Sequence, residues 1–163
     1  MEKITVTRFD EKTWKEYCIW KNSRQYYGAI YNTPTKISSK ILPNTILFVI
    51  EMNNSLNKIE GIGLIKNYLN LQKKFKIYQE DNYNRYTYKS KYRIGKEELS
   101  NEEDKIIKVL EILLFKGPKH MKRGQGIQVI ADWIQYNKAF NFNEFIKNLF
   151  IKKYKTTKNN IFI

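Results

Sequence analysis

The chain has 163 residues, with 30 Lys or Arg against 16 Asp or Glu and one His, so its formal net charge is +14. This length allows one domain with its own core, and the single cysteine, Cys18, excludes a disulfide framework and a cysteine-based zinc site. So large a positive charge makes polyanions, above all nucleic acid, the expected partners.

Membrane insertion and secretion are not expected. The first twenty residues contain no unbroken apolar segment, and no apolar run approaches the length of a membrane span. We therefore expect no membrane partner and an intracellular location, cytoplasmic or nuclear. A viral protein would instead lie in the virion or the virus factory.

The first half of the chain predicts a strand, a short helix and a hairpin. Residues 4–9 alternate apolar and polar side chains and indicate a strand, and Asp10 has the character of a helix N-cap. Residues 22–39 are irregular and rich in tyrosine. The apolar runs 45–51 and 59–65 flank a polar turn and predict a buried hairpin.

The second half predicts strands at 75–78 and 86–92, a helix at 101–115, a strand at 127–130 and a helix at 143–150. The pair Ser100 and Glu103 is a capping box. Helices that bracket a run of strands indicate an α+β fold with a small, mostly antiparallel, partly closed or barrel-like sheet. We expect one domain over residues 1–155, followed by a frayed basic tail at 156–163.

The stretch Phe115–Ile127 combines four cations, the only histidine and three glycines. Glycines let the backbone approach an anion and expose N–H groups, so this stretch is interpreted as a phosphate-binding loop. A solvated connector is the alternative. The predicted phosphate ligands are Lys116, Lys119, Lys122, Arg123 and Gln125.

Catalysis and metal binding have little support in the sequence. His120 has only cations near it in the chain, without the nucleophile and carboxylate that a general base needs. No metal-ligand spacing and no Walker-type glycine loop appear. We expect no catalytic residue, no metal and no cofactor, with a metal-independent nuclease that uses His120 and Lys122 or Arg123 as the enzymatic alternative.

Tyrosines interleave with basic residues between Tyr83 and Arg93. Aromatic faces stack on unpaired bases while Lys and Arg hold the backbone, as in the binding of single-stranded RNA. The alternative is a strand whose tyrosines only cover the sheet.

Several of these pieces, taken in order, resemble the PUA-like superfamily and its YTH and EVE domains. They are Ile19-Trp20 at the end of the first helix, the basic and aromatic segment Ser23–Tyr27, the hairpin Ile46–Ile65, and Lys122–Ile127. The last is similar to the YTH segment Arg-Asp-Gly-Gln, which contacts the RNA backbone, but it lacks the aspartate. The helix at 101–115 would be an insertion.

In YTH domains a tryptophan at the end of the first helix forms one wall of a cage for N6-methyladenosine, so the resemblance implies this role for Trp20. It also implies that Asp10 or Asn22 reads the base edge. The second cage tryptophan has no clear equivalent, with Tyr88, Tyr92 or Trp133 as candidates. The base pocket implied by the resemblance consists of Trp20, Asp10, Asn22, Tyr26, Tyr88 and Tyr92.

The sequence therefore predicts an RNA-binding module, not an enzyme, that recognises a modified or flipped-out base and grips the flanking phosphates. N6-methyladenosine is the candidate base and single-stranded RNA the candidate partner, with DNA left open. The alternative of another class is a packaging protein that binds nucleic acid without reading bases. It would be viral, given the abundance of Lys, Asn, Ile and Tyr.

Overall fold

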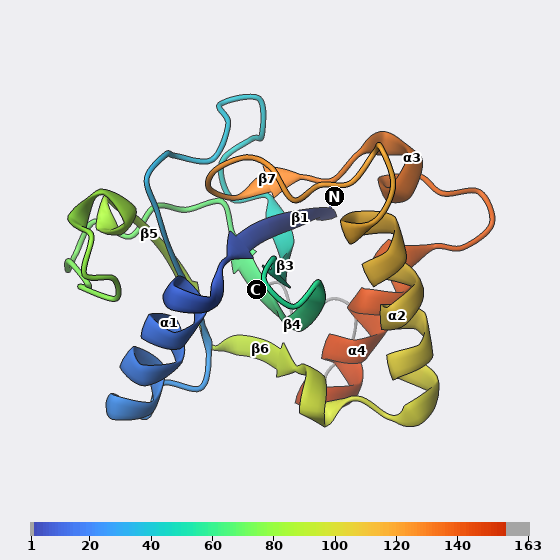
Figure 1. Cartoon of the computed structure of the whole chain (residues 1–163), viewed down its shortest axis with the longest axis horizontal. Helices are drawn as coiled ribbons and strands as arrows, with labels where there is room; N and C mark the ends of the chain where they lie inside the picture. Colours follow the sequence, from blue (N-terminus) through green and yellow to red (C-terminus); the bar gives the residue numbers. More distant parts are fainter. Residues whose placement is uncertain (1, 156–163) are drawn as a thin grey trace.

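A five-stranded sheet with the order β6-β4-β3-β1-β7 forms the centre of the computed structural model (Figure 1), which describes residues 2–155. Its strands are β1 (Glu2–Phe9), β3 (Ile46–Asn53), β4 (Lys58–Lys66), β6 (Tyr92–Gly95) and β7 (Gln128–Val129). β1 runs parallel to β3, and the other neighbouring strands are antiparallel.

Helices and a small second sheet cover the two faces of this central sheet. They are α1 (Glu11–Ser23), α2 (Asn101–Phe115), α3 (Asp132–Gln135), α4 (Phe142–Tyr154), the 3-10 helices η1 (Asp81–Asn84) and η2 (Lys96–Glu98), and the antiparallel ribbon of β2 (Ala29–Thr33) and β5 (Tyr86–Ser90). α2 and α4 lie on one side, and α1 and the ribbon lie on the other (Figure 1). None of the helices within residues 2–155 is long and apolar enough to cross a bilayer.

Strand β3 supplies both cores because successive side chains of a strand point to opposite faces. Phe48 and Ile50 pack against the side of α2 and α4, whereas Leu47 and Val49 pack toward α1 and the ribbon. Every residue of β3 is buried, which explains why its sequence is a nearly continuous apolar run.

Capping side chains fix the starts of α1 and α2, two of the three helices that the sequence predicted. Asp10 accepts a hydrogen bond from the backbone N–H of Thr13 at 2.8 Å, so α1 begins directly after β1. Ser100 and Glu103 form the reciprocal capping box at the start of α2. The predicted N-cap and capping box are confirmed, as is the hairpin of β3 and β4.

The α+β class is confirmed, but several details differ from the sequence-based expectation. Over residues 2–155 the sheet is open, with β6 and β7 at its edges, and the central β1–β3 pair is parallel. The irregular segment 22–39 contains β2. Residues 75–78 form no strand, because the backbone N–H groups of Ile77 and Tyr78 donate to the side chain of Asn84. The predicted tail at 156–163 lies outside the described residues.

A buried carboxylate joins the central sheet to the ribbon. The side chain of Glu51 on β3 is fully buried and accepts two hydrogen bonds from Arg93 of β6, at 2.8 and 2.6 Å, and one from the hydroxyl of Tyr31 on β2, at 2.9 Å. Burial alone would lower the pKa of Arg93, but the charge and hydrogen bonds of Glu51 raise it above its ordinary value. The guanidinium of Arg93 therefore stays charged inside the fold.

Replacing Arg93 by Leu leaves the buried Glu51 carboxylate without its counter-charge, so we expect a loss of about 3–5 kcal/mol in the free energy of unfolding. The measurement is the urea midpoint. Adding Glu51→Gln to Arg93→Leu should recover part of the loss, because no buried charge remains. Lys105→Ala, which removes an exposed pair with Glu102, is the control and should change stability by less than about 0.5 kcal/mol. Equal losses in the single and double variants would contradict this account.

Candidate nucleic-acid site

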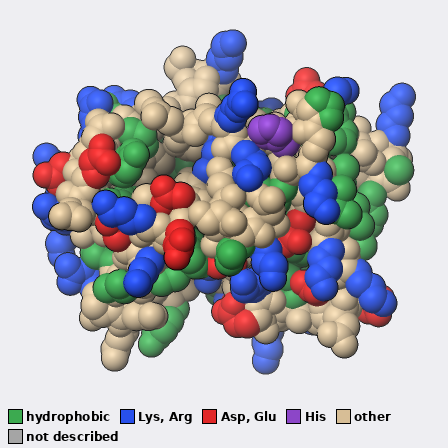
Figure 2. Space-filling model, in the orientation of Figure 1, with side chains coloured by type: hydrophobic (Ala, Val, Ile, Leu, Met, Phe, Trp, Pro, Cys, Tyr) green, Lys and Arg blue, Asp and Glu red, His purple; other side chains and the backbone are tan. Residues whose placement is uncertain are grey.

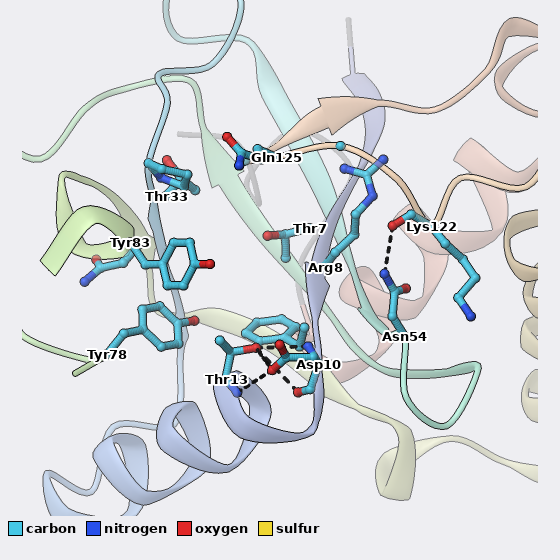
Figure 3. Close-up of a pocket in the computed structure, with 15 residues that line it drawn as sticks. Thr7, Arg8, Asp10, Thr13, Thr33, Asn54, Tyr78, Tyr83, Lys122 and Gln125 are labelled. Atoms are coloured by element: carbon cyan, nitrogen blue, oxygen red, sulfur yellow. Dashed lines mark hydrogen bonds between the residues drawn. The ribbon is translucent and has the colours of Figure 1, made fainter. Parts of the chain in front are cut away.

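A cavity of about 280 Å³ opens where β1 ends and α1 begins (Figure 3). It is bordered by the end of β1, the first turn of α1, the end of β2, the turn after β3, the segment of Tyr78 with the 3-10 helix η1 that follows it, and the loop at residues 122–126. The lining residues that carry its chemistry are Thr7, Arg8, Phe9, Asp10, Thr13, Thr33, Asn54, Tyr78, Tyr83, Lys122, Gly124, Gln125 and Gly126. Segments from five parts of the chain thus meet here.

One side of the cavity is aromatic, with rings from Phe9, Tyr78 and Tyr83. The rings of Tyr78 and Tyr83 meet edge to face with centroids 6.1 Å apart, and Figure 3 shows both side chains reaching into the cavity from the same side. Burial, followed by the charge of Glu51, raises the pKa of Tyr78 above its ordinary value, so its hydroxyl stays protonated. This side can pack against a flat ring.

Arg8 lies on the opposite side of the cavity and is a cation without an acidic partner. Its Nε donates to the carbonyl of Met121 at 2.7 Å, which fixes the guanidinium, whereas its Nη1 is buried without a hydrogen-bond partner. Within residues 2–155 no carboxylate forms an ion pair with it. Burial lowers the pKa of Arg8 below its ordinary value, yet a guanidinium remains charged in proteins. A buried donor without a partner is costly, so an anion bound here would supply the missing contact.

The loop between α2 and β7 is held against the cavity by side chains from other elements. Besides the contact of Arg8 with Met121, the side-chain amide of Asn54 donates to the carbonyl of Lys122 at 2.8 Å. Gly124 has a φ of +124°, a backbone conformation that L side chains rarely adopt, and a Cβ there would come into close contact with Gln128 Oε1 and within 3.1 Å of Arg8 Nη1, so glycine suits this position. The loop is therefore a fixed wall of the cavity.

Asp10 is the only acidic residue among those that line the cavity. Its Oδ1 accepts hydrogen bonds from the backbone and the hydroxyl of Thr13, while its Oδ2 has no partner within the described residues. Asp10 is exposed, so Oδ2 is available as an acceptor at the cavity mouth. The lining thus combines donors and one acceptor around an aromatic wall.

The structure divides the predicted phosphate ligands. Lys122 and Gln125 line the cavity. Lys116, Lys119 and Arg123 are exposed outside it, and the Lys119 ammonium lies 5.9 Å from the ring centroid of Trp133.

The single histidine also lies outside the cavity lining. His120 Nδ1 accepts the backbone N–H of Lys122 at 3.2 Å, which occupies one ring nitrogen in a structural contact. On the face shown in Figure 2, lysine and arginine side chains are spread widely and surround the histidine. Within residues 2–155 no group of three His, Cys, Asp or Glu side chains is placed to hold a metal ion.

The expectation that Trp20 forms an open cage wall is not met. Trp20 is only 6% exposed and lies in the core on the α1 side, with Tyr26 and Phe75 rings at 6.0 and 5.7 Å and the guanidinium of Arg24 at 5.1 Å from its ring. Its apolar surface is covered by these neighbours, and it lines none of the cavities described here. Of the residues predicted for the base pocket, only Asp10 lines the first cavity.

The other residues predicted for the base pocket lie in three separate places. Asn22 and Tyr26 line a second cleft, at the other end of α1. Tyr88 is buried, and its hydroxyl accepts the backbone N–H of Ile37. Tyr92 packs edge to face against Tyr154 at 4.9 Å. The predicted set is therefore not a single site.

Sequence reasoning missed Arg8 and Tyr78 as site residues. Arg8 is the one charged residue of the predicted strand 4–9 and lies just before the N-cap, which was a usable signal, because a cation at a strand end can point into a cleft. Tyr78 gave no such signal, since its neighbours Lys76 and Ile77 read as part of an ordinary alternating strand. Its place in the cavity depends on Asn84, which shapes the backbone at Tyr78.

Asn54→Ala should loosen the wall formed by residues 122–126, because it removes the side-chain hydrogen bond to Lys122. A hydrogen bond contributes about 1 kcal/mol, so we expect trypsin to cleave after Lys122 and Arg123 about fivefold faster. The control is Asn67→Ala, whose amide holds a different loop through the carbonyls of Ile41 and Leu42. Cleavage at the same rate in Asn54→Ala and the unaltered protein would show that the contact does not hold the loop.

No family model, no curated protein and no solved structure matches the chain.

Proposed function

We propose that this protein is an RNA-binding module that takes one flipped-out base or nucleotide of a single-stranded RNA into the cavity at Arg8. The base lies against Tyr78 and Tyr83, and a phosphate of the same strand contacts Arg8 and Lys122. The resemblance to YTH domains implies N6-methyladenosine as the modified base, and its methyl group would add apolar contact with the rings.

The observation that carries the proposal is the meeting of an unpaired, partly buried guanidinium with an aromatic wall in one cavity. A nucleotide has the same two parts, a flat ring and an anion. The volume of about 280 Å³ lies at the lower end of ligand pockets, which suits a single base or nucleotide better than a larger cofactor. Stacking on aromatic rings and contacts from cations to phosphates are the usual means of holding single-stranded nucleic acid.

The polar groups of the cavity can read the edge of a base. The Asp10 Oδ2 atom accepts hydrogen bonds and the hydroxyls of Tyr78 and Tyr83 donate them, since neither hydroxyl has a partner within residues 2–155. In this proposal Asp10 reads the edge of the base, as the resemblance implied, but the ring beside it is that of Tyr83 rather than that of Trp20.

The resemblance to PUA-like, YTH and EVE domains implies the same function and stays part of the proposal. The order of β1, α1 and the β3–β4 hairpin is compatible with it. The open sheet and the buried Trp20 are departures, so a PUA-like relationship would have to include a pocket with a different aromatic wall.

Arg8→Gln should weaken RNA binding about tenfold or more, since a hydrogen bond from a charged group contributes about 1.5–3 kcal/mol. The measurement is fluorescence anisotropy with a labelled single-stranded RNA. Lys15→Gln removes the same charge from an exposed position of α1 outside the cavity and should weaken binding by less than about twofold. The urea midpoint of each variant shows whether the fold is intact. If both substitutions weaken RNA binding equally, the protein attracts RNA only through its net charge and Arg8 has no special role.

Tyr83→Ala should also weaken binding about tenfold, because stacking of one base contributes about 1–3 kcal/mol. Tyr136→Ala, a substitution at a tyrosine that is 61% exposed and lies outside the cavity, is the matched control and should have little effect. If both tyrosine variants bind RNA like the unaltered protein, no base stacks on Tyr83.

The direct test of base recognition compares matched RNAs with and without one N6-methyladenosine, at two salt concentrations. A protein that recognises the methylated base should bind the methylated RNA more tightly than the unmethylated RNA at both salt concentrations. This difference in affinity should disappear in Tyr83→Ala. A packaging protein should bind both RNAs equally, and its affinity should fall steeply with salt. Cleavage of the labelled RNA in EDTA would instead reveal a nuclease.

A further inference from the structure

A second cleft, of about 490 Å³, lies at the other end of α1 and shares no lining residue with the first cavity. It is bounded by α1, the segment that leads into β2, β6, η2 and one side chain of α4. Its lining residues are Trp14, Tyr17, Cys18, Lys21, Asn22, Tyr26, Tyr27, Glu60, Arg93, Lys96, Glu97, Glu98 and Lys153.

Three of the four cations in this cleft are neutralised by carboxylates. Arg93 pairs with Glu51 at 2.6 Å, Lys96 with Glu60 at 2.5 Å, and Lys153 with Glu98 at 2.7 Å.

Lys21 is the exception. Its side chain is largely buried, and its Nζ donates to the carbonyl of Gly28 at 2.7 Å and lies 5.2 Å from the ring centroid of Tyr17. No carboxylate forms an ion pair with it within residues 2–155. An ammonium group has three donors, and a neutral carbonyl compensates its buried charge only in part.

Arg93 places a second cation beside Lys21. Its Nε and Nη2 are occupied by Glu51, whereas its Nη1 has no partner within the described residues. Burial first, and then repulsion from Arg93, lower the pKa of Lys21 to about 8, against the opposing attraction of Glu51, Cys18 and Glu97. Lys21 thus faces the cleft without a carboxylate partner and Arg93 faces it with one nitrogen that Glu51 does not occupy, so a bound anion would reduce their repulsion.

The rings beside these cations indicate what kind of anion fits. Trp14 and Tyr26 are half-buried in the lining, and Tyr27 is 79% exposed at its edge. Glu97 also lines the cleft and has no ion pair within residues 2–155, although it is exposed and water screens it. The carboxylates of Glu60, Glu97 and Glu98 disfavour a ligand with two negative charges, so a monoanion suits the cleft best.

We propose that the second cleft binds a small aromatic carboxylate, with the carboxylate between Lys21 and Arg93 and the ring against Trp14, Tyr26 and Tyr27. This site is independent of the RNA site, because the two cavities have no lining residue in common. Sodium benzoate is the simplest probe of this chemistry.

The test measures how fast Lys21 is acetylated by a limiting amount of acetic anhydride between pH 6 and pH 10, with mass spectrometry to identify each lysine. The free amine is the reactive form, so the rate should rise through a midpoint near pH 8. Bound benzoate stabilises the ammonium form and should move this midpoint up by about one unit, which lowers the rate at pH 7 about tenfold. The exposed Lys15 on the same helix is the internal control and should not respond.

The titration of Lys21 has to be distinguished from that of the groups that face it from each neighbouring element. These are Tyr17 and Cys18 of α1, Tyr26 and Tyr27 after it, Glu51 of β3, Glu60 of β4, Arg93 of β6, Lys96, Glu97 and Glu98 of η2, and Lys153 of α4. Reading the acetylation of Lys21 itself, residue by residue, separates its midpoint from theirs.

Inorganic phosphate and sodium chloride at matched ionic strength complete the experiment. Chloride should leave the midpoint of Lys21 unchanged, and phosphate should move it much less than benzoate does. If phosphate acts as strongly as benzoate, the aromatic part of the proposal is wrong. If neither anion moves the midpoint, the cleft is no anion site.

The affinity of a Lys21 variant for benzoate is a second test of the same site. Lys21→Met keeps the length of the side chain and should weaken benzoate binding about tenfold or more, measured by the fluorescence of Trp14 and its neighbours, whereas Lys15→Met should not change it. RNA binding by Lys21→Met should be unaltered. Failure of the RNA experiments would therefore leave this proposal standing, and loss of benzoate binding alone would leave the RNA site standing.

Discussion

The fully buried carboxylate of Glu51 constrains how the sheet, the ribbon and β6 fit together. Its three hydrogen bonds come from Arg93 on β6 and Tyr31 on β2, two elements that reach it across β4. A Cβ at Gly63 would collide with the Tyr31 hydroxyl, and one at Gly61 with the Arg93 guanidinium. The alternating glycines of β4 therefore leave the space that the buried charge needs for its partners.

The same charged network influences the pKa of one lining residue in each cavity. On one side Glu51 contributes to the raised pKa of Tyr78, which keeps that hydroxyl a donor in the first cavity. On the other side Arg93 faces the second cleft and, after burial, is the largest cause of the lowered pKa of Lys21. Because the Glu51–Arg93 pair cannot be broken without leaving a buried charge unpaired, it holds β6, and with it one wall of the second cleft, in place.

Local features of the chain were predictable from sequence, whereas the assembly of the cavity was not. The N-cap Asp10, the capping box of α2 and the β3–β4 hairpin each depend on residues close in sequence, and all three were predicted correctly. The β2 strand was missed because it is defined by pairing with β5, more than fifty residues away. Trp20 was misjudged for a related reason, since Phe75, which covers it, comes from a distant segment.

The contrast between Arg8 and Arg123 shows why charge alone could not locate the site. Both are cations near the same loop, but Arg123 is exposed, so its contact with a phosphate would be weakened by water and salt. The guanidinium of Arg8 is already partly desolvated and fixed by Met121, so a phosphate that reaches it meets an oriented donor at little further cost. A net charge of +14 can attract any polyanion. In the proposed function, selection of one nucleotide depends on the small part of that charge that is buried, unpaired and held beside a ring.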